Sequence, residues 1–336
     1  MSQGAWLVTG ASGFLGRHLL DEIHAGTADP RAVALVRNPG EWDAMGWTRA
    51  LTGVETISGT VADAEQWGDD PRLDGVAGIF HLAALVRHRR RGAGELYRTN
   101  VEGTAAMVRL AARRRCRMVF VSTSGTVGCF RSASGSADEA SPFCEAEVSG
   151  WPYYTSKIAA EREARRLAGQ LGVDLVIVRP PVLLGPGDHK FRSTGHLTRF
   201  LRGRLPFLVS GGMHFADVRD AARALLRAMV RPGARPVYHL PGTVCSIEEF
   251  FALAGSIAGK KPPSRMLPYR TAWWLARLTE PLGVLPDPVV IEMAAHHWGM
   301  RSLFAGTELD YQSRPGAETL RDTVEWLRAN HPGLAA

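Results

Sequence analysis

A tyrosine and a lysine stand four residues apart in the segment YYTSK at residues 153–157. The stretch from Tyr153 to Ala168 is compatible with a helix, and this spacing places both side chains on one helical face. A phenol titrates at about 10 in water. It therefore exchanges protons poorly at neutral pH unless a nearby cation, here Lys157, stabilises the phenolate. The pair predicts proton transfer by Tyr153, and Tyr154 is the alternative without the four-residue spacing.

Glycines near the start of the chain indicate a nucleotide site. The apolar run from Ala5 to Val8 leads into Gly10, Gly13 and Gly16, and an apolar-periodic segment follows. This order predicts a strand, a tight turn and a helix. Glycine lets the backbone approach a pyrophosphate, and the start of a helix attracts its charge. The residues expected to contact the dinucleotide here are Gly10, Ser12, Gly13, Phe14, Leu15 and Gly16.

Four later segments extend this pattern in a fixed order. They are FHLAA at residues 80–84, TNVEGT with Asn100, MVFVSTSG with Ser124, and VIVRPPVLLGPG at residues 176–187. With the glycine turn and the Tyr–Lys pair, they resemble the extended short-chain dehydrogenase/reductase family, in the NAD-dependent epimerase/dehydratase superfamily. The resemblance covers nearly the whole chain.

The resemblance implies roles for particular residues. Ser124, with Thr123 as the alternative, would hydrogen-bond the substrate oxygen; Tyr153 would transfer the proton, and Lys157 would lower its pKa and hold the nicotinamide ribose. Asn100 would position a water or Lys157, or would be a polar residue at a helix start. Cofactor contacts are further expected from Leu82, Ala83, Ala84, Pro180 and Val182, as well as from Tyr153 and Lys157.

The end of the second predicted strand bears on cofactor choice. Sites for the unphosphorylated dinucleotide place an acidic residue there, whereas an arginine suits a 2′-phosphate. This chain has Arg37 and no acid at that position, so NADP(H) is favoured, with Ser12 as a further contact. NAD(H) stays open, since Arg37 could be a solvated loop residue. Asp63 stands near the place where related chains carry their adenine-contacting acid.

The substrate class is indicated mainly by departures from related patterns. Similar sugar-nucleotide dehydratases carry an Asp-Glu pair after the catalytic hydroxyl residue, but Gly125 and Thr126 follow Ser124 here. The apolar stretch at residues 180–186 is most similar to the dihydroflavonol reductase and 3β-hydroxysteroid dehydrogenase branches. The apolar residues between Trp273 and Leu285 suggest an apolar substrate, the packing of a small domain, or contact with a membrane.

Alternation of strand-like runs and helical stretches predicts an α/β fold with a doubly wound, Rossmann-like parallel sheet. The predicted strands are 5–8, 32–36, 78–82, 118–122, 174–178 and 236–240. We expect a dinucleotide-binding domain at 1–184 and 211–245. A smaller, mostly helical substrate domain is expected at 185–210 and 246–336.

The composition of the 336 residues is that of an ordinary globular protein, with 45% hydrophobic and 22% charged residues. Four scattered cysteines predict a reducing cytoplasm and no metal site. We expect no signal peptide, no integral membrane segment and no nucleic-acid partner. The net charge of +7 comes partly from Arg113–Arg115, which suits a helix end, and from the run at residues 87–91. That run is either a solvated loop or a binding site for an anionic substrate such as a coenzyme A ester.

Three functions follow from these observations. The first is an NADP(H)-dependent oxidoreductase that interconverts a ketone or aldehyde and an alcohol on an apolar small molecule. The second is a sugar-nucleotide epimerase that retains NAD, and the third is a non-catalytic sensor of nicotinamide nucleotides. Because the serine, the tyrosine and the lysine are all present, catalysis is favoured. A homodimer formed through a helix pair is common among similar proteins and is a further expectation.

Overall fold

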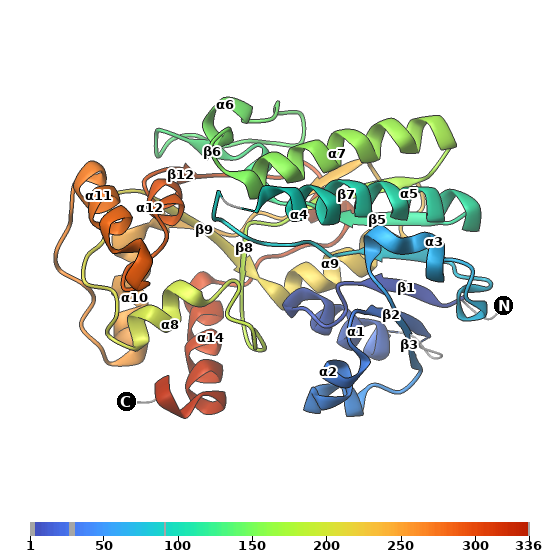
Figure 1. Cartoon of the computed structure of the whole chain (residues 1–336), viewed down its shortest axis with the longest axis horizontal. Coiled ribbons are helices and arrows are strands. Elements are labelled where there is room, and N and C mark those ends of the chain that lie inside the picture. The colour runs from blue at the N-terminus through green and yellow to red at the C-terminus, as the bar shows by residue number, and fades with distance from the viewer. Residues whose placement is uncertain (1–3, 27–30, 91, 335–336) are drawn as a thin grey trace.

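The computed structural model describes residues 4–26, 31–90 and 92–334. A seven-stranded sheet forms its centre, with every neighbouring pair of strands parallel and the order β10-β7-β5-β4-β1-β2-β3 (Figure 1). Its strands are β1 (Trp6–Thr9), β2 (Ala32–Val36), β3 (Val54–Ser58), β4 (Gly78–His81), β5 (Arg117–Val121), β7 (Leu175–Arg179) and β10 (Val237–His239). The predicted doubly wound sheet is confirmed. Its order reverses between β1 and β4, where such sheets bind ligands.

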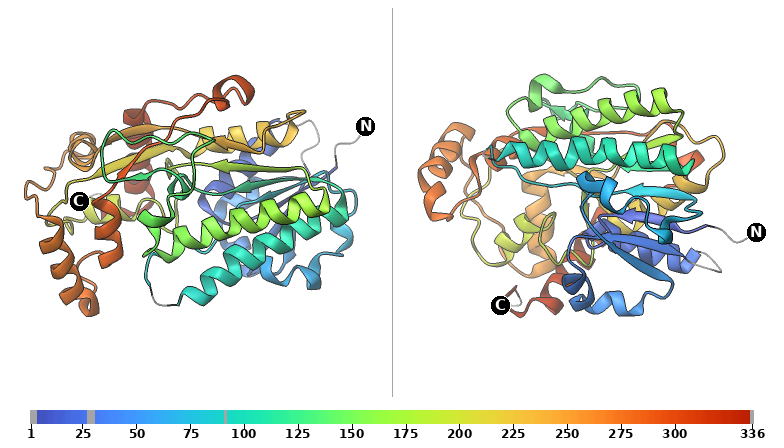
Figure 2. Two further views of the ribbon diagram at one scale, coloured as in Figure 1. Left: turned by 90° about the horizontal axis from the view of Figure 1, so that it is seen from above. Right: turned by 45° about the vertical axis from the view of Figure 1, so that its right-hand side comes forward.

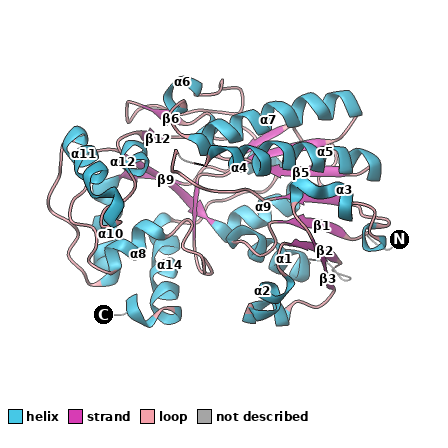
Figure 3. Cartoon of the chain, in the orientation of Figure 1, coloured by secondary structure: helices cyan, strands magenta, loops and turns pink. Residues whose placement is uncertain are grey.

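Apolar side chains on both faces of the strands explain why helices cover both sides (Figure 3). Successive strand residues point to opposite faces, so Trp6 and Val8 join one core while Leu7 joins the other. The first core includes side chains of α1 (Phe14–Gly26) and α9 (Val218–Val230). The second includes side chains of α5 (Gly103–Arg114) and α7 (Pro152–Leu171). Both layers hold the carboxyl edge of the sheet rigid.

The edge strand β3 was missed by the sequence analysis. Only Ile57 of its five residues is buried, so the strand lacks the continuous apolar run that marks the central strands. The six predicted strands all occur, and none of their ends differs from the prediction by more than one residue. The mismatch is ordinary, because strand ends depend on the pairing with neighbours rather than on local sequence.

A third core lies beyond the end of the central sheet. It is built from a three-stranded sheet in the order β11-β9-β8 and from three helices that pack on it (Figure 2). The elements are β8 (Val182–Leu184), β9 (Gly212–Asp217), β11 (Thr243–Ser246), α8 (Gly195–Leu201), α10 (Ile247–Ala258) and α14 (Gly316–Asn330). Leu184 and Phe215, placed in the nucleotide-binding domain by the sequence analysis, join this core. The domain boundaries stay a prediction.

Further α-helices and strands lie in the described chain. They are α2 (Pro39–Ala44), α3 (Ala64–Trp67), α4 (Ala93–Tyr97), β6 (Cys129–Phe130), α6 (Glu145–Val148), α11 (Tyr269–Thr279), α12 (Pro288–Ala294), β12 (His297–Trp298) and α13 (Ala305–Glu308). β6 pairs with β12, which brings a C-terminal segment beside the turn that follows β5. Among the described residues, no helix combines the length and the apolarity that crossing a membrane requires.

Candidate active site

The glycine turn after β1 is shaped by contacts with its own surroundings. Gly10 has a φ of +73°, and a Cβ there would lie 2.8 Å from the Ala83 nitrogen. A Cβ on Gly16 would lie 2.3 Å from the Gly10 carbonyl oxygen. Both positions therefore need glycine for the β1, α1 and β4 backbones to meet.

Gly13 is different, because its outer side is open. A Cβ there would meet the Gly10 oxygen at 3.0 Å and no other described atom within 4 Å. The turn ends at Phe14, where α1 begins, and the first N–H groups of a helix have no partner inside it. An open glycine backbone and a helix start at the switch point of the sheet fit the pyrophosphate of a dinucleotide.

The ends of β2 and β3 carry the two charged residues expected near the adenosine. Arg37 follows β2, is exposed, and makes no ion pair with any described residue. Asp63 lies after β3, and its two carboxylate oxygens accept hydrogen bonds from Thr60 Oγ1 at 2.6 Å and from Arg98 at 3.1 Å. These contacts lower the pKa of Asp63. Arg37 is thus available to a ligand phosphate, whereas the Asp63 carboxylate already has partners.

The segment after β4 is anchored from two sides. Ala83 N–H donates to Thr9 Oγ1 at 3.2 Å, and the buried His81 ring lies 2.9 Å from both Thr9 Oγ1 and Thr104 Oγ1. Burial lowers the pKa of His81 to about 3, so the ring is neutral. Leu82 and Ala83 are therefore held beside Gly10, as a cofactor-contacting segment would require.

Asn100 connects this segment to α7. Its side-chain amide accepts from Leu85 N–H at 2.8 Å and donates to Leu85 O at 3.1 Å and to Ser156 Oγ at 2.9 Å. Asn100 is not at a helix start but within a π-helical turn, Arg98–Glu102, that joins α4 to α5. In the described structure it hydrogen-bonds the residue before Lys157 and not Lys157 itself.

Hydroxyl groups after β5 differ in whether they have partners. Ser122 Oγ donates to Glu161 at 2.5 Å, and Thr123 Oγ1 accepts from Gly125 N–H at 3.3 Å. Thr126 Oγ1 lies 3.2 Å from Glu161. The Ser124 hydroxyl makes no hydrogen bond with the described residues, although its backbone N–H is fixed 2.8 Å from Pro180 O. This difference favours Ser124 over Thr123 as the group that contacts a substrate.

The two tyrosines at the start of α7 have different surroundings. Tyr154 is buried among Trp151, Trp298 and Cys129, and a Cβ on Gly125 would lie 2.0 Å from its ring. Tyr153 is half-buried. Packing therefore makes Tyr154 a core residue, and Tyr153 stays the predicted proton-transfer residue.

Lys157 lies one turn after Tyr153 and is 1% exposed. Its ammonium donates to the Val121 carbonyl oxygen at 2.9 Å and lies 4.3 Å from the centre of the Phe120 ring. Burial lowers its pKa to about 7, with the charge of Glu161 acting in the opposite direction. The site thus holds a buried amine that titrates near neutral pH.

The expectation that Lys157 lowers the pKa of Tyr153 is not met in this structure. Burial raises the pKa of Tyr153 to about 12, and no charge offsets it, because the ammonium is directed at Val121 O. The phenol is therefore protonated at neutral pH. Such a group is prepared to donate a proton rather than to accept one.

We expect Lys157→Met to stabilise the protein below neutral pH. The ordinary pKa of 10.5 falls to about 7 on folding, so the unfolded chain binds more protons between these values. Stability therefore rises with pH across that window, and below it the cost of burying the ammonium is fully present. The gain in stability of the variant over the parent should be larger by about 4 kcal/mol at about pH 6 than near pH 10, since one pKa unit corresponds to about 1.36 kcal/mol.

Urea denaturation of nucleotide-free protein at both pH values measures this effect. Lys261→Met, at an exposed lysine, controls for the loss of one positive charge. A Lys157→Met variant that is less stable than the parent at both pH values would contradict the cost assigned to the buried ammonium.

A buried ion pair behind the site was not predicted from sequence. Arg179, at the end of β7, makes two hydrogen bonds to Glu161 of α7, at 3.0 and 2.6 Å, and approaches His239 of β10 at 3.2 Å. Neither Glu161 nor Arg179 is more than 2% exposed. The pair joins α7 to the sheet edge and fixes the helix that carries Tyr153 and Lys157. Glu161 continues their four-residue spacing, which is a signal that sequence reasoning could have used.

The basic run after β4 is not simply a solvated loop. His88 lies edge-on to Tyr153, with ring centres 5.8 Å apart, and its buried Nδ1 has no hydrogen-bond partner among the described residues. Arg90 pairs with Glu292 of α12 at 2.7 Å, while Arg87 pairs with Glu95 at 3.0 Å. Arg91 lies outside the described residues. His88 therefore lies against the predicted catalytic tyrosine, whereas the sequence analysis treated it as one member of a charged run.

Pro180 and Val182 follow β7 at the carboxyl edge of the central sheet. Pro180 is buried and holds the Ser124 turn through its carbonyl oxygen, and Val182 begins β8 with 37% of its surface exposed. Because the strands are parallel, the glycine turn, the segment after β4 and Ser124 all lie at the carboxyl edge of the sheet. The face of α7 that carries Tyr153 and Lys157 joins them, since α7 packs on the 124–126 turn.

Comparison with known proteins assigns the family. The model of the NAD-dependent epimerase/dehydratase family matches residues 6–240, and the chain belongs to that family. It is 30% identical to a putative dihydroflavonol 4-reductase of Synechocystis, over 97% of this chain and 95% of the relative. It is 31% identical to a 4-hydroxy-2-methyl-3-oxo-4-farnesyl-3,4-dihydroquinoline-1-oxide ketoreductase of Stigmatella aurantiaca, over 82% of this chain and 79% of the relative.

Solved structures agree with this assignment. The crystal structure of gox2253 has a TM-score of 0.82 and 28% identity, and the match covers 97% of this chain and 98% of that one. A dTDP-glucose 4,6-dehydratase of Streptomyces venezuelae has the same fold, with a TM-score of 0.78, 24% identity and 98% of each chain covered. The predicted membership of the extended short-chain dehydrogenase/reductases is confirmed. The protein is an NAD(P)-binding member of a family of oxidoreductases, epimerases and dehydratases.

Proposed function

We propose that the protein is an NADP(H)-dependent reductase that converts a ketone or aldehyde on an apolar small molecule into an alcohol. The observation that carries this proposal is which hydroxyl groups near the site already have hydrogen-bond partners and which do not. Ser124 and Tyr153 have hydroxyls without described partners, while Ser122, Thr123 and Thr126 are all engaged. Two such groups beside the predicted cofactor site suit a carbonyl oxygen that becomes an alkoxide.

In this mechanism, the nicotinamide supplies the hydride when bound. Ser124 donates a hydrogen bond to the carbonyl oxygen and stabilises its growing negative charge. Tyr153 gives its proton to the alkoxide, which is a stronger base than a phenolate even when burial raises the pKa of Tyr153 to about 12. Lys157 lies on the next turn of α7 after Tyr153, and its ammonium donates to the carbonyl oxygen of Val121. It is the residue that would hold the nicotinamide ribose.

Packing around the Ser124 turn argues against a dehydratase. Elimination of water needs an acid and a base close to the substrate, and similar dehydratases carry them directly after the catalytic hydroxyl. At Gly125 any side chain would meet the Tyr154 ring at 2.0 Å, and the Thr126 side chain is buried against Glu161. A carboxylate cannot enter at either place without displacing the core.

An apolar substrate is supported by the walls of the site and by the relatives. Pro180, Pro181 and Val182 present no hydrogen-bonding side chain. The Stigmatella relative is named for a farnesylated quinoline ketone. A similar apolar ketone is the substrate class that we infer for this chain.

NADP(H) rather than NAD(H) is supported by Arg37. Its exposed guanidinium stands at the end of β2, where its charge acts on Glu41 but forms no ion pair with a described carboxylate, and it can bind a 2′-phosphate bidentately. The thiols of all four cysteines are free, which suits the reducing cytoplasm that we propose as the location.

Screening apolar ketones with NADPH tests the proposed reaction. We expect loss of NADPH absorbance that depends on the ketone, and formation of one alcohol per NADPH consumed. Epimerised product with no net oxidation of NADPH would reject the reductase in favour of the epimerase. Absence of turnover with every ketone, together with tight nucleotide binding, would favour the sensor.

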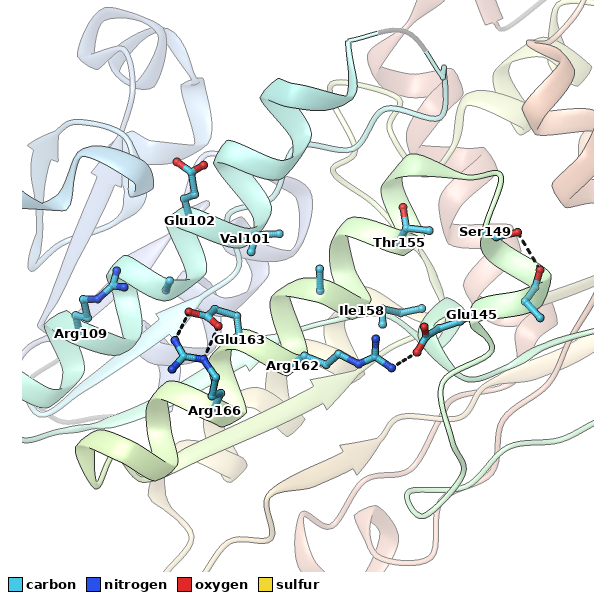
Figure 4. A pocket seen from close by; sticks show the side chains of 13 residues that line it. Val101, Glu102, Arg109, Glu145, Ser149, Thr155, Ile158, Arg162, Glu163 and Arg166 are labelled. Atoms are coloured by element: carbon cyan, nitrogen blue, oxygen red, sulfur yellow. Dashed lines mark hydrogen bonds and ion pairs between the residues drawn. The ribbon is translucent and has the colours of Figure 1, made fainter.

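We further propose a homodimer through the outer surface of α5 and α7. A groove of about 810 Å³ lies there, with Val101, Ala105, Ile158 and Ala159 among its lining residues (Figure 4). Its remaining walls carry charges of both signs, from Glu102, Arg109, Glu145, Arg162, Glu163 and Arg166. A surface that mixes acids and bases in this way can pair with a copy of itself.

Ala159→Arg should convert the dimer to a monomer. The substitution places a long charged side chain in the apolar part of the groove, where a partner would bury it unpaired. Light scattering after gel filtration would then report half the parent mass, while Leu171→Arg, at the exposed end of the same helix, should keep the parent mass. A parent protein that is itself monomeric would contradict the dimer.

A further inference from the structure

Exposed apolar side chains concentrate in one segment of the chain. Thirteen large hydrophobic residues are exposed within the described chain, and seven of them fall between residues 266 and 284. They are Met266, Tyr269, Trp274, Leu275, Leu278, Leu282 and Val284, which we call the α11 face. Leu278 and Leu282 are 72% and 75% exposed. Isolated apolar residues on a surface are ordinary, whereas a cluster of this kind marks a place of contact.

The helix explains how the face arises. Ala272 and Ala276 are fully buried and belong to a core that includes Ile291 of α12. Trp274 and Leu278 occupy the opposite side of α11, because residues two positions away from a buried pair point outward on a helix of 3.6 residues per turn. Small residues therefore attach the helix to the protein, and large apolar ones project from it. Figure 2 shows α11 at the edge of the molecule.

Charge around the α11 face is almost entirely positive. Residues 259–286 contain five lysines and arginines and one acid, Glu280. Glu280 is already paired with Arg277. Lys261, Arg265 and Arg270 are exposed and have no carboxylate partner among the described residues. These three cations are therefore available to an anionic surface, because no carboxylate in the described chain pairs with them.

We propose that the α11 face binds to the surface of a membrane that contains anionic lipids. A helix whose apolar side carries tryptophan and leucine, with arginine and lysine beside it, lies in the plane of a lipid interface. The leucines and Trp274 enter the boundary between headgroups and acyl chains, and the basic residues contact lipid phosphates. Each cation near such a surface adds electrostatic attraction, which salt weakens.

Contacts link this face to the candidate active site. Glu292 of α12 accepts hydrogen bonds from Trp273 of α11 at 2.7 Å, from Trp151 at 2.9 Å and from Arg90 at 2.7 Å. Trp151 immediately precedes α7, and Arg90 is two residues from His88, which touches Tyr153. A protein docked through α11 would hold its site beside the lipid, where apolar ketones dissolve. This last consequence rests on the proposed function, whereas the docking itself does not.

Flotation with lipid vesicles tests the docking on the full chain. The probes are vesicles of phosphatidylcholine alone and of phosphatidylcholine with phosphatidylglycerol in a roughly two-to-one ratio. We expect the parent to float with the anionic vesicles and to be released by high salt. Leu278→Glu with Leu282→Glu should reduce the bound fraction at least about tenfold, because two charges would have to enter the interface. Leu171→Glu with Leu303→Glu, at exposed sites elsewhere, is the matched control and should float like the parent.

Three results would overturn the proposal. One is failure of the parent to float with anionic vesicles, and another is flotation that the α11 substitutions leave unchanged. The third is a fall in oligomer mass in the Leu278→Glu, Leu282→Glu variant, which would show that a second copy covers the face. NADPH binding by the same samples distinguishes this outcome from failure of the proposed function, since no α11 residue belongs to the nucleotide site.

Discussion

Tyr153→Phe is expected to lower kcat for ketone reduction by about 10³-fold, within the range that a positioned general acid contributes. Among the described residues, the Tyr153 hydroxyl makes no hydrogen bond, and burial keeps its pKa well above neutral, so that it carries the proton. Phenylalanine preserves the ring and its contact with His88. The dissociation constant for NADPH should therefore change by no more than about tenfold, since one neutral contact is lost.

The neighbouring tyrosine provides the control for this prediction. Tyr154→Phe removes the same atom from a ring that packs against Trp151 and Gly125, so turnover should stay within a few-fold of the parent. Steady-state kinetics of both variants, with NADPH binding measured by fluorescence, give the comparison. Substantial activity in Tyr153→Phe, or its loss only in Tyr154→Phe, would show that the proton donor is assigned to the wrong residue.

Arg37→Asp should shift cofactor preference from NADPH toward NADH by about 10²-fold or more. A charge-assisted contact to a phosphate contributes about 1.5–3 kcal/mol, and an aspartate would also repel the phosphate and accept from ribose hydroxyls. Each 1.4 kcal/mol corresponds to about tenfold in affinity. The effect should fall on NADPH binding most strongly.

Titration of the variant with both nucleotides checks this expectation. Arg49→Asp changes the net charge equally at an exposed position after α2, and it should leave the ratio of dissociation constants near that of the parent. An unchanged ratio in Arg37→Asp would mean that another residue meets the 2′-phosphate, or that the natural cofactor has none.

Sequence patterns predicted the fold well where chemistry and local structure coincide. Gly10 and Gly16 are needed by the backbone contacts of their own turn, so their spacing identifies a strand, a turn and a helix without knowledge of the rest. Tyr153 and Lys157 lie on one helix, and helical spacing is enough to bring them together. The central strands are buried on both faces and show it as continuous apolar runs.

Long-range contacts were the part that sequence could not supply. Arg179 and Glu161 belong to different elements, and only the sheet order places β7 beside β5 under α7. His88 looked like one member of a basic run, and its contact with Tyr153 depends on how the segment after β4 bends. The pKa values of Lys157 and Tyr153 depend on burial and on the direction of the ammonium, neither of which spacing reveals.

A reductase binds NADPH reversibly, so the nucleotide content of the purified protein tests the proposed function most directly. The protein is purified without added nucleotide and denatured, the released cofactor is assayed, and the intact protein is then titrated with NADPH and NADH. We predict little released nucleotide and much tighter binding of NADPH than of NADH. Release of one equivalent of NAD per chain would contradict the account and identify an enzyme that returns the hydride to its substrate.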